Sequence, residues 1–143
     1  MENKLNKLLA NFVVEYHKLQ NYHWYIKGKD FFQVHAKLEE IYNGINSSID
    51  ELAENILMLG YKPVASLKDF LEVSDIEEAE MEDVKSKHIF KEVLKDFDKL
   101  LKDVIEIKKE ADENNIYLIS ALMDDYIKEF YKSIWMIKQV IED

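Results

Sequence analysis

The residues with the clearest capacity for chemistry lie in one stretch of the chain, and all of them are histidines or carboxylates. His35 is followed four residues later by Glu39, and Asp50 is followed four residues later by Glu54. Side chains four apart lie one turn above another on the same helix face, so each pair can present two ligands to one metal ion. Imidazole and carboxylate donors without thiolates suit Fe(II), Mn(II) or Zn(II) and leave positions open for an oxidant.

Both pairs belong to a polar stripe that lies beside the core-facing stripe of the predicted helix. The stripe consists of His35, Glu39, Tyr42, Asn46, Asp50, Glu54 and Leu57. The 15 residues from His35 to Asp50 span roughly 22 Å of helix, so the two pairs cannot bind one metal within one chain. If two copies of this helix cross antiparallel about a two-fold axis, the first pair of one copy meets the second pair of the other. The spacing therefore predicts a homodimer with two equivalent sites.

His23 is a further candidate ligand, near the predicted end of the preceding helix and twelve residues before His35. Gly28 lies between them and is a natural left-handed helix stop. A bend there brings the imidazole of His23 beside the start of the next helix. His23, His35 and Glu39 then form a cluster from one chain.

The main alternative is an intrachain di-iron centre inside a four-helix bundle, which requires Glu three residues before a His. The residues that occupy this position before the four histidines are Val14, Gln20, Phe32 and Lys85. An intrachain centre of that kind is therefore not expected. The other two histidines, His17 and His88, are interpreted as structural or solvent-exposed.

Composition sets the class of protein. The chain has 143 residues, 48% hydrophobic and 34% charged, with only 3 Gly and 1 Pro to interrupt long helices. This predicts a single all-α domain, 1–143. The absence of cysteine excludes disulfides, thiolate metal sites and iron–sulfur clusters. No apolar run approaches the roughly 18 residues of a membrane span and the first residues do not resemble a signal peptide, so we expect a cytoplasmic protein without membrane contact.

The formal net charge is −10, from 19 basic and 29 acidic residues. Such a charge repels nucleic acid and favours cations as small partners. Acidic residues grouped around a three-fold axis of an oligomer would concentrate Fe(II) at an entry pore. The candidates for such a pore are Asp112, Glu113, Asp124 and Asp125.

Apolar spacing predicts four long amphipathic helices, over 5–26, 34–59, 90–104 and 119–141. The segment between the second and third is long enough to cross the length of a bundle. Within it, Ser66 is expected to cap a short helix, 66–72. This connectivity is that of a ferritin-like four-helix bundle with a short extra helix in the long crossover between helices 2 and 3.

Four motifs occur in a specific order along the chain: NYHWYIKG at 21–28, FFQVH at 31–35, DELAE at 50–54 and SIWM at 133–136. Their order and spacing resemble the Dps family, the DNA-binding proteins from starved cells, over nearly the whole chain. The resemblance implies a hollow dodecamer of ferritin-like subunits with ferroxidase sites at two-fold interfaces. It further implies oxidation of Fe(II), preferentially by hydrogen peroxide, storage of ferric mineral and protection against oxidative damage.

The resemblance also implies which residues form each site. His23, His35 and Glu39 come from one subunit, and Asp50 and Glu54 from its partner, in agreement with the spacing. These five residues are the predicted catalytic metal ligands. Fe(II) is the substrate and ferric iron the product, while Zn or Mn suit the same donors.

Three features depart from the family pattern. Glu39 stands where Asp is common, and Asn55 stands where Arg is usual. Members that bind DNA often carry a mobile basic tail, whereas here only Lys4 and Lys7 precede the first apolar repeat. The charge and the short basic start argue against DNA binding. Two alternative functions remain open: a Dps-like shell that acts as a nucleoid-binding or surface interaction protein, and a Zn or Mn binder without redox turnover.

Overall fold

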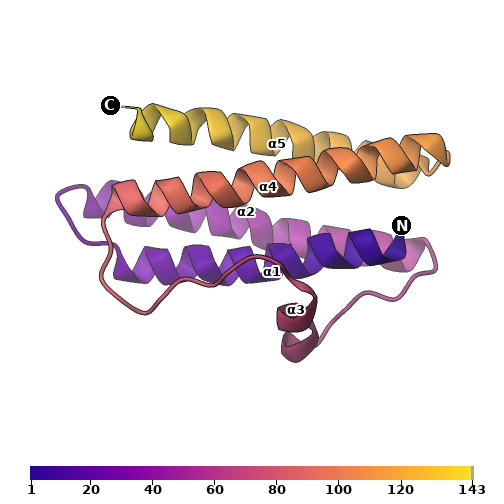
Figure 1. Ribbon diagram of the computed structural model, residues 1–143, viewed down its shortest axis with the longest axis horizontal. Coiled ribbons are helices and arrows are strands. Elements are labelled where there is room, and N and C mark those ends of the chain that lie inside the picture. The colour runs from indigo at the N-terminus through magenta and orange to yellow at the C-terminus, as the bar shows by residue number, and fades with distance from the viewer. Residues whose placement is uncertain (143) are drawn as a thin grey trace.

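The computed structural model describes residues 1–142, and these form five helices. They are α1 (Glu2–Tyr25), α2 (Phe31–Met58), α3 (Leu67–Val73), α4 (Ser86–Glu113) and α5 (Tyr117–Ile141). The long helices form two hairpins, α1 with α2 and α4 with α5, which lie side by side in an elongated bundle (Figure 1). The all-α prediction is confirmed. None of the helices in this described part is long and apolar enough to cross a membrane.

The connection from α2 to α4 runs along the outside of the bundle and carries α3, which packs against α1 (Figure 1). Ser66 caps α3 as predicted, since its hydroxyl oxygen accepts a hydrogen bond from the backbone N–H of Asp69 at 3.2 Å. At its far end the crossover pairs with the turn between α1 and α2. There the N–H of Lys27 donates to the carbonyl of Val84, whose own N–H donates to the carbonyl of Tyr25. These bonds fix the turn that follows the last residues of α1.

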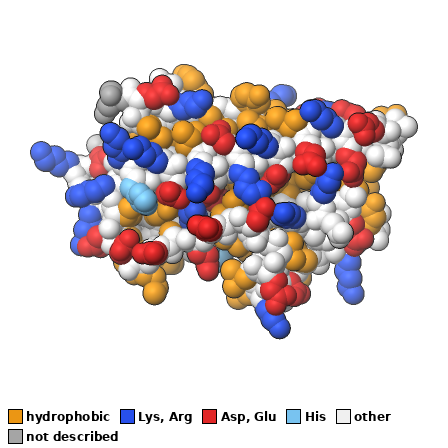
Figure 2. Space-filling model, viewed as in Figure 1, with side chains coloured by type: hydrophobic (Ala, Val, Ile, Leu, Met, Phe, Trp, Pro, Cys, Tyr) orange, Lys and Arg blue, Asp and Glu red, His pale blue; other side chains and the backbone are white. Residues whose placement is uncertain are grey.

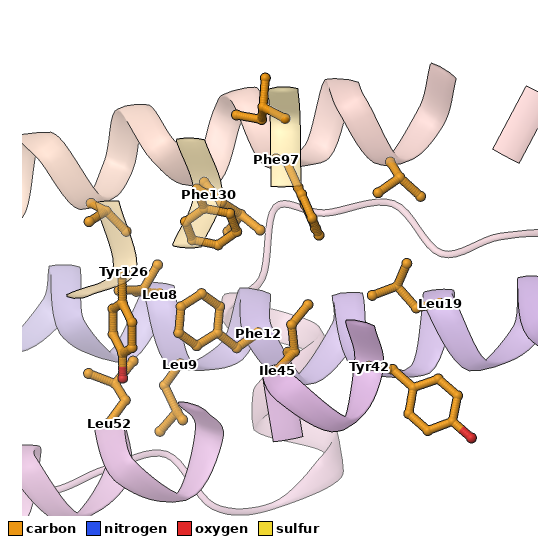
Figure 3. Close-up of a cluster of buried hydrophobic side chains, with 14 of the residues drawn as sticks. Leu8, Leu9, Phe12, Leu19, Tyr42, Ile45, Leu52, Phe97, Tyr126 and Phe130 are labelled. Carbon is orange, nitrogen blue, oxygen red and sulfur yellow. The ribbon is translucent and has the colours of Figure 1, made fainter. Parts of the chain in front are cut away.

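Aromatic rings from three helices fill the centre of the bundle (Figure 3). The ring centroid of Phe12 in α1 lies 5.4 Å from that of Tyr126 in α5, and Phe97 in α4 lies 5.2 Å from Phe130, both edge to face. Such pairs stabilise a core by about 0.5–1.5 kcal/mol beyond the burial of their surface. The Tyr126 hydroxyl also donates to the Glu51 carboxylate at 3.2 Å. This bond ties α5 to α2, so the core orients the helix that carries the predicted ligands.

A charged cluster lies inside the bundle between α1 and α4. The Nζ atom of Lys18 lies 2.8 Å from Oδ2 of Asp96, and both side chains are buried. Glu15, one turn earlier on α1, is fully buried, and among the described residues no donor reaches either of its carboxylate oxygens. Burial and the negative charge of Asp96 raise the pKa of Glu15 well above its usual value. Folding therefore favours the protonated form of Glu15.

Replacing Glu15 by glutamine is expected to stabilise the protein at neutral pH, because glutamine matches the neutral acid in shape and cannot ionise. Because folding raises the pKa of Glu15, this residue contributes fully to stability when the pH is below its ordinary pKa of 4.5. That contribution is lost as the pH rises towards the pKa of Glu15 in the folded protein. Thermal unfolding at pH 4 and pH 8 measures the effect. The gain in midpoint for Glu15→Gln should be small at pH 4 and larger at pH 8. A gain that does not change with pH, or equals that of the exposed-site control Glu78→Gln, contradicts the assignment.

Candidate metal centre

The end of α1 and the start of α2 bring His23 and His35 into contact. Their imidazole rings stack with centroids 3.6 Å apart and planes inclined by 12°. The turn between the two helices contains Gly28 at a φ of +140°, a backbone conformation that residues with a Cβ rarely adopt. His23 is only 5% exposed, so the pair is inserted between the helices rather than held on the surface.

Each of these imidazoles is oriented by the backbone of the other residue. Nδ1 of His23 lies 2.6 Å from the carbonyl oxygen of His35, and Nδ1 of His35 lies 2.7 Å from the carbonyl oxygen of His23. A carbonyl oxygen only accepts, so each Nδ1 carries the hydrogen and donates it. In the neutral ring Nε2 then keeps its lone pair, which is the atom available to a metal ion. The fold therefore presents two oriented imidazoles as candidate ligands.

Glu39 lies one turn beyond His35, on the same side of α2. Its Oε1 atom lies 3.7 Å from Nε2 of His23. Two ligand atoms that each lie about 2.0–2.2 Å from one metal ion are separated by roughly 3–3.5 Å. Because the Glu39 side chain is 55% exposed, the small movement that closes this difference meets little resistance.

Two aromatic side chains hold the imidazoles in place. Phe31 stacks on His35 with centroids 4.8 Å apart, and Tyr42 meets the ring of His23 edge to face at 5.3 Å. Sequence reasoning did not assign Phe31 to the site. The signal was present, because Phe31 lies four residues before His35 and therefore on the same face of the helix.

Asp50 and Glu54 form a second group of candidate ligands, both exposed on α2. The pKa of Glu54 is raised above its usual value, because protonated Glu54 can donate a hydrogen bond to the Asp50 carboxylate and because the negative charge of Asp50 disfavours a second charge. Two carboxylates that compete for a proton in this way form a site where a cation can replace that proton. This pair is the most concentrated negative charge on the polar stripe of α2.

The described residues do not bring all five predicted ligands together. His23, His35 and Glu39 lie at one end of the stripe, and Asp50 and Glu54 lie roughly 22 Å away along α2 by helical rise. Nowhere in residues 1–142 do three His, Asp or Glu side chains take up an arrangement that could hold a metal ion. The two groups of predicted ligands therefore lie apart within one chain.

Charges of both signs are distributed over the molecular surface. Figure 2 shows Lys and acidic side chains interspersed over the face of α4 and the crossover. The four predicted pore residues are all exposed, and of these Asp124 lies 3.0 Å and Asp112 lies 3.6 Å from Nζ of Lys108. This lysine partly neutralises the first two acids.

Three further positions were singled out from the sequence. Asn55, which stands where the family usually has Arg, is buried and donates to the carbonyl of Glu51 within α2 at 2.8 Å. This hydrogen bond stays within α2 and does not involve a candidate ligand. His17 and His88 are exposed.

The chain is similar to known proteins over nearly its whole length. The model of the ferritin-like domain matches residues 2–143. The DNA protection during starvation protein of Helicobacter pylori strain J99 is 37% identical over 134 residues, which cover 94% of this chain and 93% of the relative. The chain belongs to the Dps family of ferritin-like proteins. The family resemblance stated from the motifs is thus confirmed.

Solved Dps structures agree with the bundle and its crossover. A Dps protein from Vibrio cholerae, described as a member of a broad superfamily of ferritin-like diiron-carboxylate proteins, has a TM-score of 0.94 at 39% identity, covering 98% of this chain and 87% of the other. Antigen TpF1 from Treponema pallidum has a TM-score of 0.96 at 30% identity, covering 99% and 90%. The predicted ferritin-like fold with its extra helix is confirmed. Membership in the Dps family supports iron binding, iron storage, oxidation of Fe(II) and protection of DNA under stress in general terms.

Proposed function

We propose that this Dps-family chain oxidises Fe(II) at sites shared between two subunits, with His23, His35 and Glu39 from one subunit and Asp50 and Glu54 from the other. The observation that carries the proposal is the pair of stacked imidazoles, each with Nδ1 bonded to a carbonyl and Nε2 left for a metal. The two carbonyl bonds satisfy one N–H of each imidazole, and they leave the other ring nitrogen without a hydrogen. Here those bonds fix both tautomers towards the state that binds metal.

Each part of the site has a separate task. The imidazoles supply neutral donors and keep the overall charge low, while Glu39 closes the site from the same chain. Asp50 and Glu54 of a second subunit supply negative charge that favours Fe(III) over Fe(II). Their competition for one proton makes exchange of that proton for iron favourable.

The proposed oxidant is hydrogen peroxide. Two Fe(II) ions each give one electron, the O–O bond of one peroxide breaks, and two hydroxide ions form with two Fe(III). Because both electrons are delivered at one site, no hydroxyl radical is released. Ferric oxo-hydroxide then accumulates in the interior of a shell, which we propose to be a cytoplasmic dodecamer with acidic entry pores near Asp112, Glu113, Asp124 and Asp125.

Anaerobic mixing of Fe(II) with hydrogen peroxide tests the reaction. Ferric absorbance should grow with two Fe(II) consumed for each peroxide, and a spin trap should detect little hydroxyl radical. Light scattering on the same sample should give a mass close to twelve times the 17.0 kDa chain. A monomeric mass, or one Fe(II) consumed per peroxide with abundant radical, contradicts the proposal.

Protection of DNA is expected to be chemical rather than by direct binding. The relatives in Helicobacter pylori and Bacillus anthracis carry the name DNA protection during starvation protein. A formal charge of −10 on each chain opposes contact with phosphates. Plasmid should therefore survive Fe(II) and peroxide when the protein is present, yet its gel mobility should not change at moderate salt. A shift that persists at moderate salt favours the nucleoid-binding alternative.

A further inference from the structure

The charged cluster between α1 and α4 contains none of the candidate metal ligands. Glu15 and Lys18 belong to α1, whereas Glu92 and Asp96 belong to α4. The Nζ atom of Lys18 lies 2.8 Å from Oδ2 of Asp96 and 3.9 Å from Oε2 of Glu92. Glu15 is fully buried, and neither of its carboxylate oxygens has a hydrogen-bond partner among the described residues. The cluster therefore holds three acids and one ammonium group, and one of the acids makes no hydrogen bond.

The three acids of this cluster converge on one place. Tyr22 lies one turn beyond Lys18 on α1. Burial raises the pKa of the Tyr22 phenol, and so do the negative charges of all three acids. At Glu15, the charge of Asp96 adds to the effect of burial and raises the pKa of the carboxyl, while the charge of Lys18 lowers it. A charge acts on a neighbouring group in this way from within about 4–6 Å. Carboxyl groups from two helices therefore lie around the end of the Lys18 side chain.

An acid-lined cleft leads from the surface to the cluster. It lies between the two helices and the crossover, which runs along the outside of the bundle (Figure 1), and its volume is about 270 Å³. Its acidic lining consists of Glu92 and four glutamates of the crossover, Glu77, Glu78, Glu80 and Glu82. Lys18 also lines it, with only 3% of its side chain exposed. A cleft lined by carboxylates concentrates cations, so metal ions are drawn towards the buried acids.

We propose that the ammonium group of Lys18 occupies the place of a divalent metal ion among Glu15, Glu92 and Asp96, and so keeps Fe(II) out of the interior of the bundle. In ferritin-like di-iron proteins, carboxylates of facing helices bind metal inside the bundle. Here such carboxylates face a side chain that brings its own positive charge. Lys18 is thus a specificity-determining residue, because it leaves the histidines and acids of the polar stripe as the place where iron binds.

Distances explain why a metal ion does not fit beside Lys18. A divalent metal ion of this kind holds carboxylate oxygens at about 2.0–2.2 Å. The nearest carboxylate oxygen lies 2.8 Å from the Lys18 nitrogen, and that of Glu92 lies 3.9 Å away. The ammonium group therefore keeps the acids too far apart, in agreement with the lack of a three-ligand arrangement in residues 1–142. A shorter side chain at position 18 would empty the centre of the cluster and allow the acids to close on a cation.

Cobalt binding by the Lys18→Ala variant tests this inference. Lys18→Met is the matched control, because it removes the same charge but fills the space with an apolar side chain of similar length. Each particle is dialysed against Co(II), and the bound metal is counted per chain. Lys18→Ala should bind one Co(II) more per chain than the wild type, and Co(II) should raise its unfolding midpoint by several degrees more. Lys18→Met should bind the wild-type number. Adding Glu15→Gln and Asp96→Asn to Lys18→Ala should remove the extra ion.

Every outcome of this experiment decides the inference. A folded Lys18→Ala particle with the wild-type Co(II) count overturns it. An extra ion that Lys18→Met also binds, or that persists after Glu15→Gln and Asp96→Asn, lies elsewhere and overturns it as well. If Lys18→Ala folds only with Co(II) and then holds one extra ion per chain, the metal has replaced the ammonium group; if Co(II) does not restore folding, the inference is wrong. Because the wild-type count subtracts the ions bound by the other ligands, the result does not depend on the proposed function.

Discussion

Replacing His35 and Asp50 together by alanine is expected to lower the rate of Fe(II) oxidation by about 100-fold or more. In a site shared across a two-fold axis, every site in the homodimer loses one imidazole from one subunit and one carboxylate from the other. Neither loss can be compensated, because the remaining Glu39 and Glu54 cannot take the places of both the His35 imidazole and the Asp50 carboxylate. The initial rate of ferric absorbance after mixing with peroxide measures the effect.

A matched control separates chemistry from folding. His88→Ala with Asp98→Ala removes the same residue types from exposed positions on α4. Both double variants should keep the particle mass, and the control should keep the wild-type rate. If the His35→Ala, Asp50→Ala particle oxidises Fe(II) at the wild-type rate, the assignment of these two residues as ligands is wrong.

The second large effect is expected from the buried cluster between α1 and α4. Lys18→Met should destabilise the protein by about 3–5 kcal/mol, because Asp96 would remain buried without its cation. The Lys18–Asp96 distance of 2.8 Å and the burial of both side chains make this the most enclosed ion pair in the described structure. Chemical denaturation at fixed protein concentration measures the loss, since dissociation of subunits makes stability depend on concentration.

The compensating variant distinguishes a charge effect from a packing effect. Adding Asp96→Leu to Lys18→Met removes both charges and should recover most of the lost stability. Lys95→Met, at an exposed position on α4, should change stability by less than about 0.5 kcal/mol. Equal losses in Lys18→Met and Lys95→Met would show that the pair contributes nothing.

Local rules were sufficient to predict the helices and their order. Apolar spacing gave all four long helices, and the cap at Ser66 gave the short one, because both depend on neighbours within a turn or two. Most helix ends lay within four residues of the prediction, but α4 continues to Glu113, nine residues beyond the predicted end at 104. The first helix stops at Tyr25 rather than near Gly28, because Ile26 and Lys27 pair with the crossover at Val84. That pairing joins segments far apart in sequence, so no local pattern could indicate it.

The candidate site was predictable in its residue types but not in its detail. Spacing alone placed His35 with Glu39 and Asp50 with Glu54, since helix geometry is regular. The bonds from Nδ1 of His23 and His35 depend on how two helices dock, which sequence periodicity does not contain. The burial of Glu15 was not predicted, because a pattern along one helix does not show which of its polar side chains a neighbouring helix covers. Its position between Phe12 and Leu19, both core residues, was the available signal.

Complementation between two inactive chains tests the shared site most directly. One chain carries His23→Ala with His35→Ala, and the other carries Asp50→Ala with Glu54→Ala. Each alone should be inactive, because every site in its homodimer lacks two of its five ligands. Each mixed dimer contains one complete site and one without any of these four ligands, so random co-assembly should restore about a quarter of the wild-type sites. If mixed dimers form, as two different affinity tags would show, and Fe(II) oxidation still stays at the level of the separate variants, the two-subunit site is contradicted.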